Sequence, residues 1–293
     1  MIYLLDEDWN NLIFSKLSEN SSFMEQFSEL SKLFNALLRL TTKIYYYITQ
    51  QEQTLLFMAA MTIFHKYRIC SDFSLNKYSS EELYIILGAC LFIGQKSINI
   101  LGIRLDYLSK FILKLIQKKY PDKKIEANDV INKIKEREME ILIIIGFNIN
   151  VDFPFPFVNK IKEHLSKTNI NSDNFLTLLN YFIKDSFILP VSLYYTPNTI
   201  TISCVLILKQ KYNLININLK ELISLSQYGL DEREIQECAS LINKLEVAIN
   251  EKRNNQKDNS KAVSSINTNN TNTVKSEEAP VTKIIPSIKM NIN

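Results

Sequence analysis

The sequence contains little glycine, proline, histidine or cysteine. Its 293 residues include 5 glycines, 7 prolines, 2 histidines and 4 cysteines. So few turn-forming residues argue against an all-β chain. No GxGxxG or GxxxxGK[ST] pattern occurs, so these two phosphate-binding loops are excluded. The chain is therefore expected to be helical and to lack a nucleotide-binding loop of either kind.

The few potential metal ligands are far apart in the sequence. The four cysteines, none of them in a CxxC pair, are Cys70, Cys90, Cys204 and Cys238. Only His65 and His164 could join them in a metal site. We therefore expect reduced thiols in an intracellular protein, with no metal and no cofactor. We interpret His65 as a residue on the surface of a helix.

The net charge of +3 is not spread over the whole chain. Residues 251–293 hold seven Lys or Arg and four Asp or Glu, which accounts for the excess. The remaining residues, 1–250, therefore hold 27 groups of each sign. A duplex-binding surface usually has a basic bias, so only a strongly local basic patch would support one here. We expect no direct nucleic-acid partner.

Neither a signal peptide nor a membrane span is expected. Asp6, Glu7 and Asp8 stand where a signal peptide would be apolar. The longest apolar runs, 83–94 and 141–147, are too short to cross a bilayer. We therefore expect no membrane partner and a location in the nucleus, with the cytoplasm as an alternative.

Regular spacing of apolar residues predicts helices in the first half of the chain. They are expected within 1–21 and over 22–47, 51–69, 80–95, 104–118 and 125–146. Ala59 and Ala60 are small enough to allow a close helix crossing. Residues 81–96 form the most apolar long stretch, so this helix should be surrounded by others. Lys96 ends it, and Gly146 suits the end of the last helix.

A second helical unit is predicted after residue 150. Pro154 and Pro156 prevent helix through FNINVDFPFPF, which marks a domain boundary. Further helices are expected near 157–166, 172–188, 197–212, 217–227 and 231–250. We predict an all-α chain with an N-terminal helix in 1–21, domains over 22–150 and 151–250, and a disordered tail over 251–293. The apolar cluster near Ile284 could be a docking segment, but a plain tail is favoured.

Two segments of the chain repeat one pattern. FMAAMTIFHKY (57–67) and ITISCVLILKQKY (200–212) begin 143 residues apart. Each combines two adjacent small residues with bulky aliphatic residues, and each ends in a basic cluster and a tyrosine. This repetition predicts two stacked helical units, each built around a central helix.

Three segments resemble the cyclin family, in particular its transcription-associated group. GACLFIGQK (88–96) is similar to the third cyclin-box helix, and MEILIIIGFNINVDFPFPFV (139–158) to the fifth helix and the link after it. IKDSFILPVSLYYTPNTITIS (183–203) is similar to the second box. The resemblance covers about 22–250 and implies two tandem five-helix cyclin boxes. Residues 193–208 most resemble cyclin H, with cyclins C, K, L and T close.

The resemblance also implies a kinase-binding pair. The family's lysine corresponds to Lys96 and its glutamate to Glu138; in relatives these hydrogen-bond to backbone around the kinase C-helix. The acidic residues that usually follow the lysine are replaced here by Ser97-Ile98-Asn99. The apolar residues after Lys96 include Ile98 and Leu101. They are interpreted either as the rim of the kinase-binding surface or as core of the 96–104 connection.

The implied function is that of a non-catalytic, activating subunit of a cyclin-dependent kinase. A cyclin H-like protein would serve a kinase that phosphorylates other kinases and the RNA polymerase II tail, with a third assembly subunit as an optional partner. One alternative is a general transcription factor with two cyclin folds that bind nucleic acid. The neutral body and the absence of an N-terminal Cys/His zinc ribbon argue against it. Another is a scaffold with no kinase partner.

Overall fold

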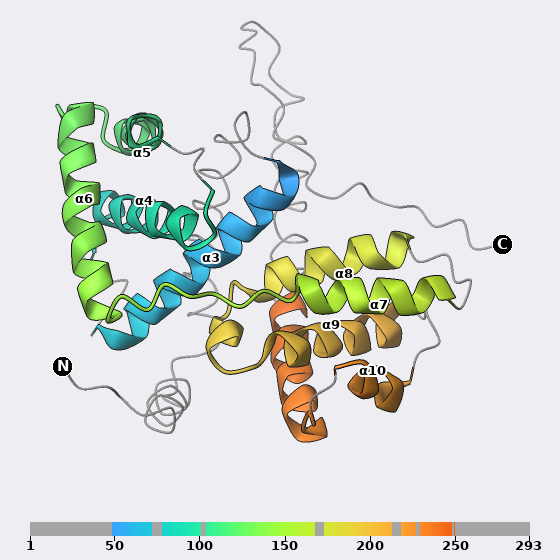
Figure 1. Ribbon diagram of the computed structural model, residues 1–293. Coiled ribbons are helices and arrows are strands. Elements are labelled where there is room, and N and C mark those ends of the chain that lie inside the picture. Colours follow the sequence, from blue (N-terminus) through green and yellow to red (C-terminus); the bar gives the residue numbers. More distant parts are fainter. Residues whose placement is uncertain are drawn as a thin grey trace, which may run out of the picture. The chain divides into compact units, whose positions relative to one another are not determined.

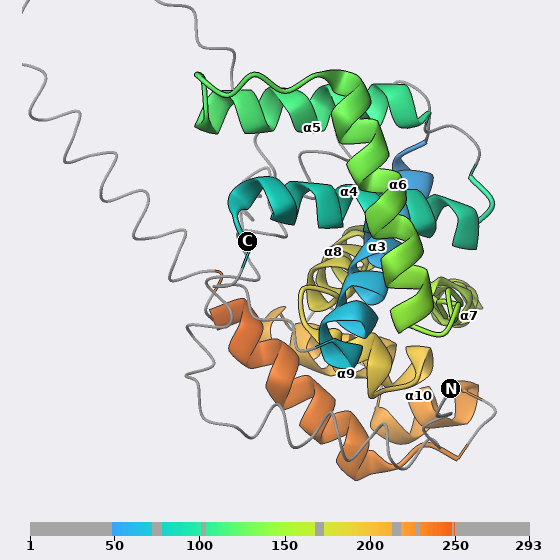
Figure 2. The same cartoon turned by 90° about the vertical axis from the view of Figure 1, so that its left-hand side faces the viewer.

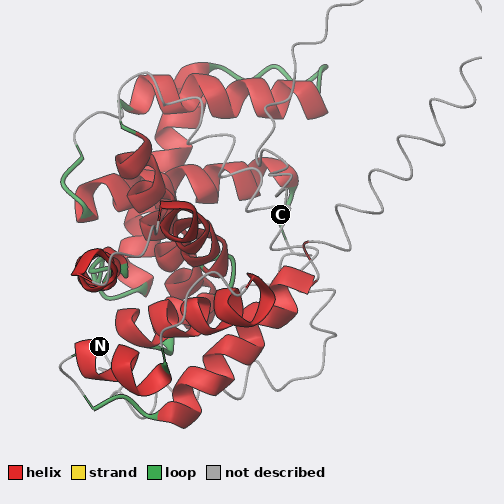
Figure 3. Cartoon of the chain, turned by 90° about the vertical axis from the view of Figure 1, so that its right-hand side faces the viewer, coloured by secondary structure: helices red, strands yellow, loops and turns green. Residues whose placement is uncertain are grey.

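The structure, a computed structural model, is all-α in the part of the chain that it describes. The described residues are 49–71, 78–100, 104–167, 173–212, 218–226, 229–247 and 249. Within these ranges the elements are helices joined by loops, without strands (Figures 1 and 3). This confirms the predicted fold class. The helices predicted within 1–21 and over 22–47, and the tail over 251–293, lie outside the described residues.

Two helices form the centre of the first part of the chain, and each begins with a capping box. They are α3 (Gln50–Cys70) and α4 (Ser80–Ser97). Thr49 and Ser79 each begin a capping box, in which the hydroxyl accepts from the backbone N–H three residues on. The glutamate at that position bonds back to the cap, so two otherwise unpaired N–H groups are satisfied at each helix start. Most of both helices is buried.

Small residues allow α3 and α4 to pack closely. A Cβ atom added to Gly94 would lie 3.1 Å from the backbone nitrogen of Ala60 and 3.5 Å from the Cβ of Ala59. These two alanines were predicted to permit a close crossing, and the prediction is confirmed. The partner on α4 is Gly94, while Gly88 in the same helix faces Ile112 and Ile134 instead.

Two amphipathic helices cover α4. They are α5 (Leu105–Lys119) and α6 (Ala127–Ile144). Figure 2 shows α4 and α5 running across α6. Leu108, Ile112 and Ile116 are the buried apolar residues of α5, one helical turn apart. Gly146 follows α6 with φ +60°, as expected for a helix stop.

The second part of the chain is also made of helices. Its elements are α7 (Phe155–Lys167), α8 (Asp173–Ser186), the short 3-10 helix η3 (Pro190–Leu193), α9 (Pro197–Tyr212), α10 (Leu219–Leu225) and a helix over 232–247. Residues 199–205 of α9 are all buried, as a central helix of the predicted second unit should be. Thr196 and Asp231 cap the starts of their helices, and each accepts from a backbone N–H of its helix, at 3.2 and 2.8 Å.

Polar contacts join α3 to the second part and correct one prediction. His65 was expected on a helix surface, but only 1% of it is exposed. Its Nε2 lies 3.3 Å from the carbonyl oxygen of Phe187, to which it donates. Burial, with the charge of Arg68, lowers the pKa of His65 to about 3, so the ring is neutral. The prediction failed because α3 is covered by the segment that begins at Phe187.

A second contact holds the link between the two parts. Lys66 donates from Nζ to the carbonyl oxygen of Asn148 at 3.0 Å, to its Oδ1 at 3.1 Å, and to the carbonyl oxygen of Asn150 at 2.8 Å. The described helices belong to one compact unit within residues 1–249. A division into domains at residue 150 stays a prediction.

Candidate partner-binding site

The end of α4 places Lys96 at a defined position. Asn99 has φ 54°, its N–H bonds to the carbonyl of Lys96, and the N–H of Ile100 bonds to the carbonyl of Gln95 at 3.0 Å. This is the bond pattern of a Schellman motif, with asparagine in the left-handed position that glycine usually takes. The unusual Ser97-Ile98-Asn99 segment therefore ends the helix immediately after Lys96.

The structure brings Lys96 and Glu138 together. Lys96 Nζ lies 2.6 Å from Glu138 Oε1, within charge-assisted hydrogen-bond distance. The Lys96 side chain is 52% exposed and that of Glu138 only 11%. The ammonium also lies 4.5 Å from the centroid of the Phe92 ring, one turn earlier on α4. Glu138 shares the buried face of α6 with Ile134 and Ile141. The ion pair therefore lies at the edge of the contact between α4 and α6.

Neighbouring glutamates on α6 have different surroundings. Glu136 is exposed. Glu140 accepts from Arg137 at 2.6 and 2.7 Å and from the hydroxyl of Tyr67 at 3.2 Å. Of the three carboxylates, Glu138 is the one that meets the last turn of α4.

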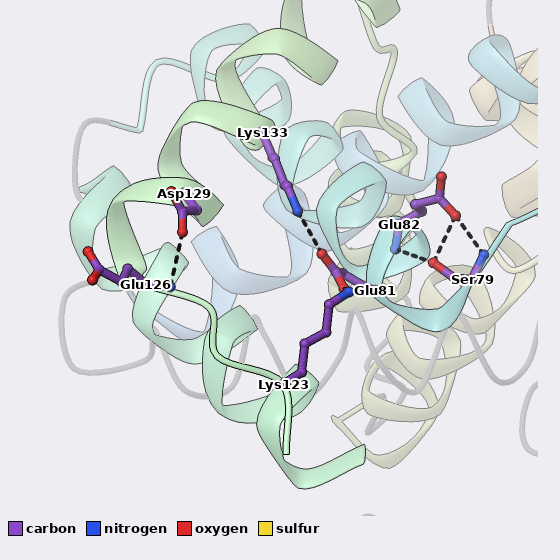
Figure 4. A network of polar contacts seen from close by, with 7 residues as sticks. All are labelled: Ser79, Glu81, Glu82, Lys123, Glu126, Asp129 and Lys133. Atoms are coloured by element: carbon purple, nitrogen blue, oxygen red, sulfur yellow. Dashed lines mark hydrogen bonds and ion pairs between the residues drawn. The ribbon is translucent and has the colours of Figure 1, made fainter. Parts of the chain in front are cut away.

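A second ion cluster joins the other end of α4 to α6. Glu81 is buried and contacts both Lys123 and Lys133, the latter at 2.8 Å (Figure 4). Burial acts to raise the pKa of Glu81, but the two lysines outweigh it and the pKa lies below its usual value. Ion pairs therefore hold both ends of α4, through Glu81 at its start and Lys96 at its end. The cluster was not predicted from the sequence.

Apolar residues in the second half of α6 and just after it remain exposed. Met139 is 54%, Ile143 62% and Phe147 58% exposed, and the three recur every four residues from the position after Glu138. Side chains four residues apart lie on one helix face, so Met139 and Ile143 share a face of α6, and Phe147 follows the end of the helix. These three residues are here called the α6 strip. It was not predicted from the sequence, although seven of the nine residues of MEILIIIGF (139–147) are large and apolar and a helix can bury only part of such a run.

The end of α6 fixes the last residue of the strip. Gly146 donates to the carbonyl of Ile143 at 3.1 Å, and Phe147 donates to that of Leu142 at 2.7 Å. With Gly146 at φ +60°, this is again a Schellman motif. Phe147 has φ 58°, which a bulky residue rarely adopts. Its ring is thereby held outside the core.

The structure describes one of the two other predicted site residues. Ile98 is half-buried and packs against the core, and the adjacent Ile100 is 8% exposed. Leu101 lies outside the described residues. The role of Ile98 and Leu101 in binding stays a prediction.

Three observations on the described part of the chain bear on other functional classes. No group of three or more metal-binding side chains is found there. No described helix has the length and apolarity needed to cross a membrane. The thiols of Cys90, Cys204 and Cys238 are buried and free, and burial raises the pKa of each. They are poor nucleophiles for that reason.

Comparison with known proteins gives similarity at the level of fold. No protein-family model and no curated protein sequence matches the chain. Among the solved structures that match is a chain of the yeast RNA Pol II CTD kinase CTDK-1 complex, with a TM-score of 0.58 and 17% sequence identity. The match covers 74% of this chain and 64% of the other, so this chain spans under two thirds of that protein's length. The likeness supports a cyclin-like fold.

Proposed function

We propose that the protein is the regulatory subunit of a cyclin-dependent protein kinase and activates it by packing on the kinase C-helix. The observation that carries the proposal is the Lys96–Glu138 pair, which lies at the edge between the two helices where the cyclin resemblance requires it. The cyclin-like fold, shared with a chain of a kinase complex, supports the same conclusion.

The pair is suited to bind backbone groups of a partner. The Lys96 ammonium has three N–H donors, and its bond to Glu138 uses one of them. Glu138 has two oxygens, each able to accept more than one bond, and Oε1 is the one that meets Lys96. Because the surrounding helices hold both groups in place, little side-chain entropy remains to be lost when a partner binds.

The α6 strip would supply the apolar part of the interface. Met139, Ile143 and Phe147 are large and exposed. Exposed apolar patches bordered by polar residues are typical of protein interaction sites. Because Met139 and Ile143 lie 100° or more around α6 from Glu138, a partner would have to reach around this helix to cover both the strip and the pair.

Binding of this kind activates a kinase by a shift in populations. A rigid helical surface that fits the active C-helix position better than the inactive one favours the active state by that difference in affinity. The active position allows the kinase's own lysine–glutamate pair to form, which phosphoryl transfer requires. The protein would itself catalyse no reaction.

Kinase activation by point variants tests the proposal. The chain is co-expressed with each cyclin-dependent kinase subunit of its source organism, and kinase activity is measured on a peptide from the polymerase tail. Lys96→Ala with Glu138→Ala should reduce activation at least tenfold. The matched control is Lys135→Ala with Glu136→Ala, two exposed residues of the same types on α6, which should retain activation. Equal activation by both double variants contradicts the proposal.

Within this function we favour a role in transcription. The resemblance is to cyclin H and its relatives, and the similar solved structure is named as a kinase complex for the RNA polymerase II tail. We accordingly propose a nuclear location and a substrate in that tail. An assembly subunit would be detected as a third component that co-purifies in constant proportion.

A further inference from the structure

One face of α5 combines regularly spaced lysines with an exposed aromatic ring. Lys110, Lys114 and Lys118 are exposed and recur every four residues. Each step of four residues advances about 6 Å along a helix. Tyr107, which is 37% exposed, lies on the same face one turn before Lys110. We call these four residues the α5 basic face.

This face is directed away from the core. The buried residues of α5 are Leu108, Ser109, Ile112 and Ile116. At 100° per residue the basic face lies on the opposite side of the helix from them. The pair proposed to bind the kinase lies on α4 and α6, so the basic face belongs to a different helix.

The local charge is strongly positive although the whole body is neutral. Residues 104–124 contain seven Lys or Arg and two Asp. Asp106 is paired with Arg104 at 3.1 Å, and Lys123 with the buried Glu81, while Asp122 is exposed after the end of α5. No described carboxylate forms an ion pair with the three lysines of the face. The strongly local patch that the sequence required for a nucleic-acid surface is therefore present.

The aromatic ring favours a single strand over a duplex. Arg104 and Lys110 lie over the Tyr107 ring, 5.6 and 5.9 Å from its centroid, so two cations accompany this partly exposed ring. Proteins that bind single strands combine cations that follow the phosphates with aromatic side chains on which unpaired bases stack. In a duplex the bases are already stacked on one another, so none would be available to stack on the Tyr107 ring.

We propose that the α5 basic face binds single-stranded nucleic acid, with Lys110, Lys114 and Lys118 on successive phosphates and Tyr107 under a base. This goes beyond kinase activation and does not depend on it. The contacts are to phosphates and to a base face, so binding should show little sequence preference.

Binding of a labelled RNA to the full chain tests the proposal. The probe is a fluorescein-labelled 20-nucleotide single-stranded RNA of mixed sequence, followed by anisotropy over a series of salt concentrations. Lys110→Gln with Lys114→Gln and Lys118→Gln should weaken binding at least tenfold and reduce the salt slope by about 2, since each phosphate contact on a single strand contributes about 0.7. Tyr107→Ala should weaken binding about tenfold while leaving the slope unchanged.

A charge-matched control separates this face from general attraction. Lys162→Gln with Lys167→Gln and Lys220→Gln removes three exposed lysines from α7 and α10, and should leave binding within twofold. Circular dichroism of all variants should match that of the unchanged chain. Equal weakening by both triple variants overturns the proposal. It is also overturned if an RNA duplex, a serine phosphopeptide of equal charge or an anionic lipid vesicle binds the face more tightly than the single strand.

Discussion

Lys96 Nζ and Glu138 Oε1 lie 2.6 Å apart although the two residues are 42 positions apart in the chain. Lys96 is the last residue but one of α4 and Glu138 lies within α6, so the contact joins these two helices. Half of the lysine side chain is exposed, whereas the carboxylate is almost buried. The pair is therefore both a link between two helices and a polar group available at the surface.

The pair should contribute little to stability. Because Lys96 is half exposed, solvent screens the attraction, and such pairs contribute ~1 kcal/mol or less. Lys96→Ala alone should cost more than this, since it leaves the nearly buried Glu138 without its lysine. Urea unfolding of the two single variants and the double variant gives the coupling energy. A coupling above about 3 kcal/mol would show that the pair is mainly structural.

Glu81 should matter more for stability than Lys96. Its carboxylate is buried and contacts two lysines, so Glu81→Gln should cost about 1–3 kcal/mol. The exposed Glu136 provides the control, because Glu136→Gln should change stability by no more than about 0.5 kcal/mol. Urea unfolding of both variants at pH 7 makes the comparison, and similar costs would contradict the assigned role of the cluster.

The Glu81 cluster should also weaken in acid. The pKa of Glu81 is lowered in the folded chain from a reference value of 4.5. The stabilisation is therefore fully present above pH 4.5 and is lost as the pH falls through the lower, folded-state pKa. The difference in unfolding free energy between the unchanged chain and Glu81→Gln should shrink below pH 4.5. A difference that stays constant down to pH 3 would contradict this.

His65 should make the free energy of unfolding depend on pH below 6.5. The folded-state pKa is about 3 and the reference value 6.5, so below pH 6.5 the unfolded chain takes up a proton that the folded chain does not. Stability attributable to His65 is full above pH 6.5 and falls by about 1.4 kcal/mol per pH unit toward pH 3. His65→Gln, which keeps a donor for Phe187, should lose this slope between pH 6.5 and 4.5. His164→Gln changes the only other histidine and should retain it.

Two glycines of α4 should respond differently to alanine. In Gly94→Ala the new Cβ meets the backbone of Ala60 at 3.1 Å, and backbone cannot move aside without separating α3 from α4. In Gly88→Ala it meets the end of the Ile112 side chain, which can rotate, and the helix gains about 1 kcal/mol in propensity. We expect Gly94→Ala to lower the melting temperature more than Gly88→Ala. The reverse order would contradict the proposed helix contact.

Helix positions were largely predictable because local signals agreed. Apolar spacing placed the helices, and the side chains of Ser79, Thr196 and Asp231 cap helix starts in the structure. The stop at Asn99 was locally encoded as well, since asparagine tolerates positive φ. This helix stop was not predicted, because the segment was interpreted only as a departure from the cyclin pattern and not as a helix-ending motif.

The remaining features depend on contacts between distant residues. His65 was wrongly placed on a surface because its cover, the segment at Phe187, lies 122 positions away. Glu81 was missed because its lysines lie 42 and 52 positions away. Periodicity shows which face of a helix is apolar, but it does not show which other helix covers that face. For Lys96 and Glu138 the cyclin resemblance supplied this information.

The most direct test of the central claim is kinase activation by a charge-exchanged pair, Lys96→Glu with Glu138→Lys. The exchange keeps opposite charges at both positions and can preserve the link between α4 and α6, which the melting temperature checks. It reverses the charge presented at each point to a partner. If the pair binds the kinase, activation should stay at least tenfold below that of the unchanged chain. Recovery of full activation would contradict the account, because the pair would then serve only to hold the two helices together.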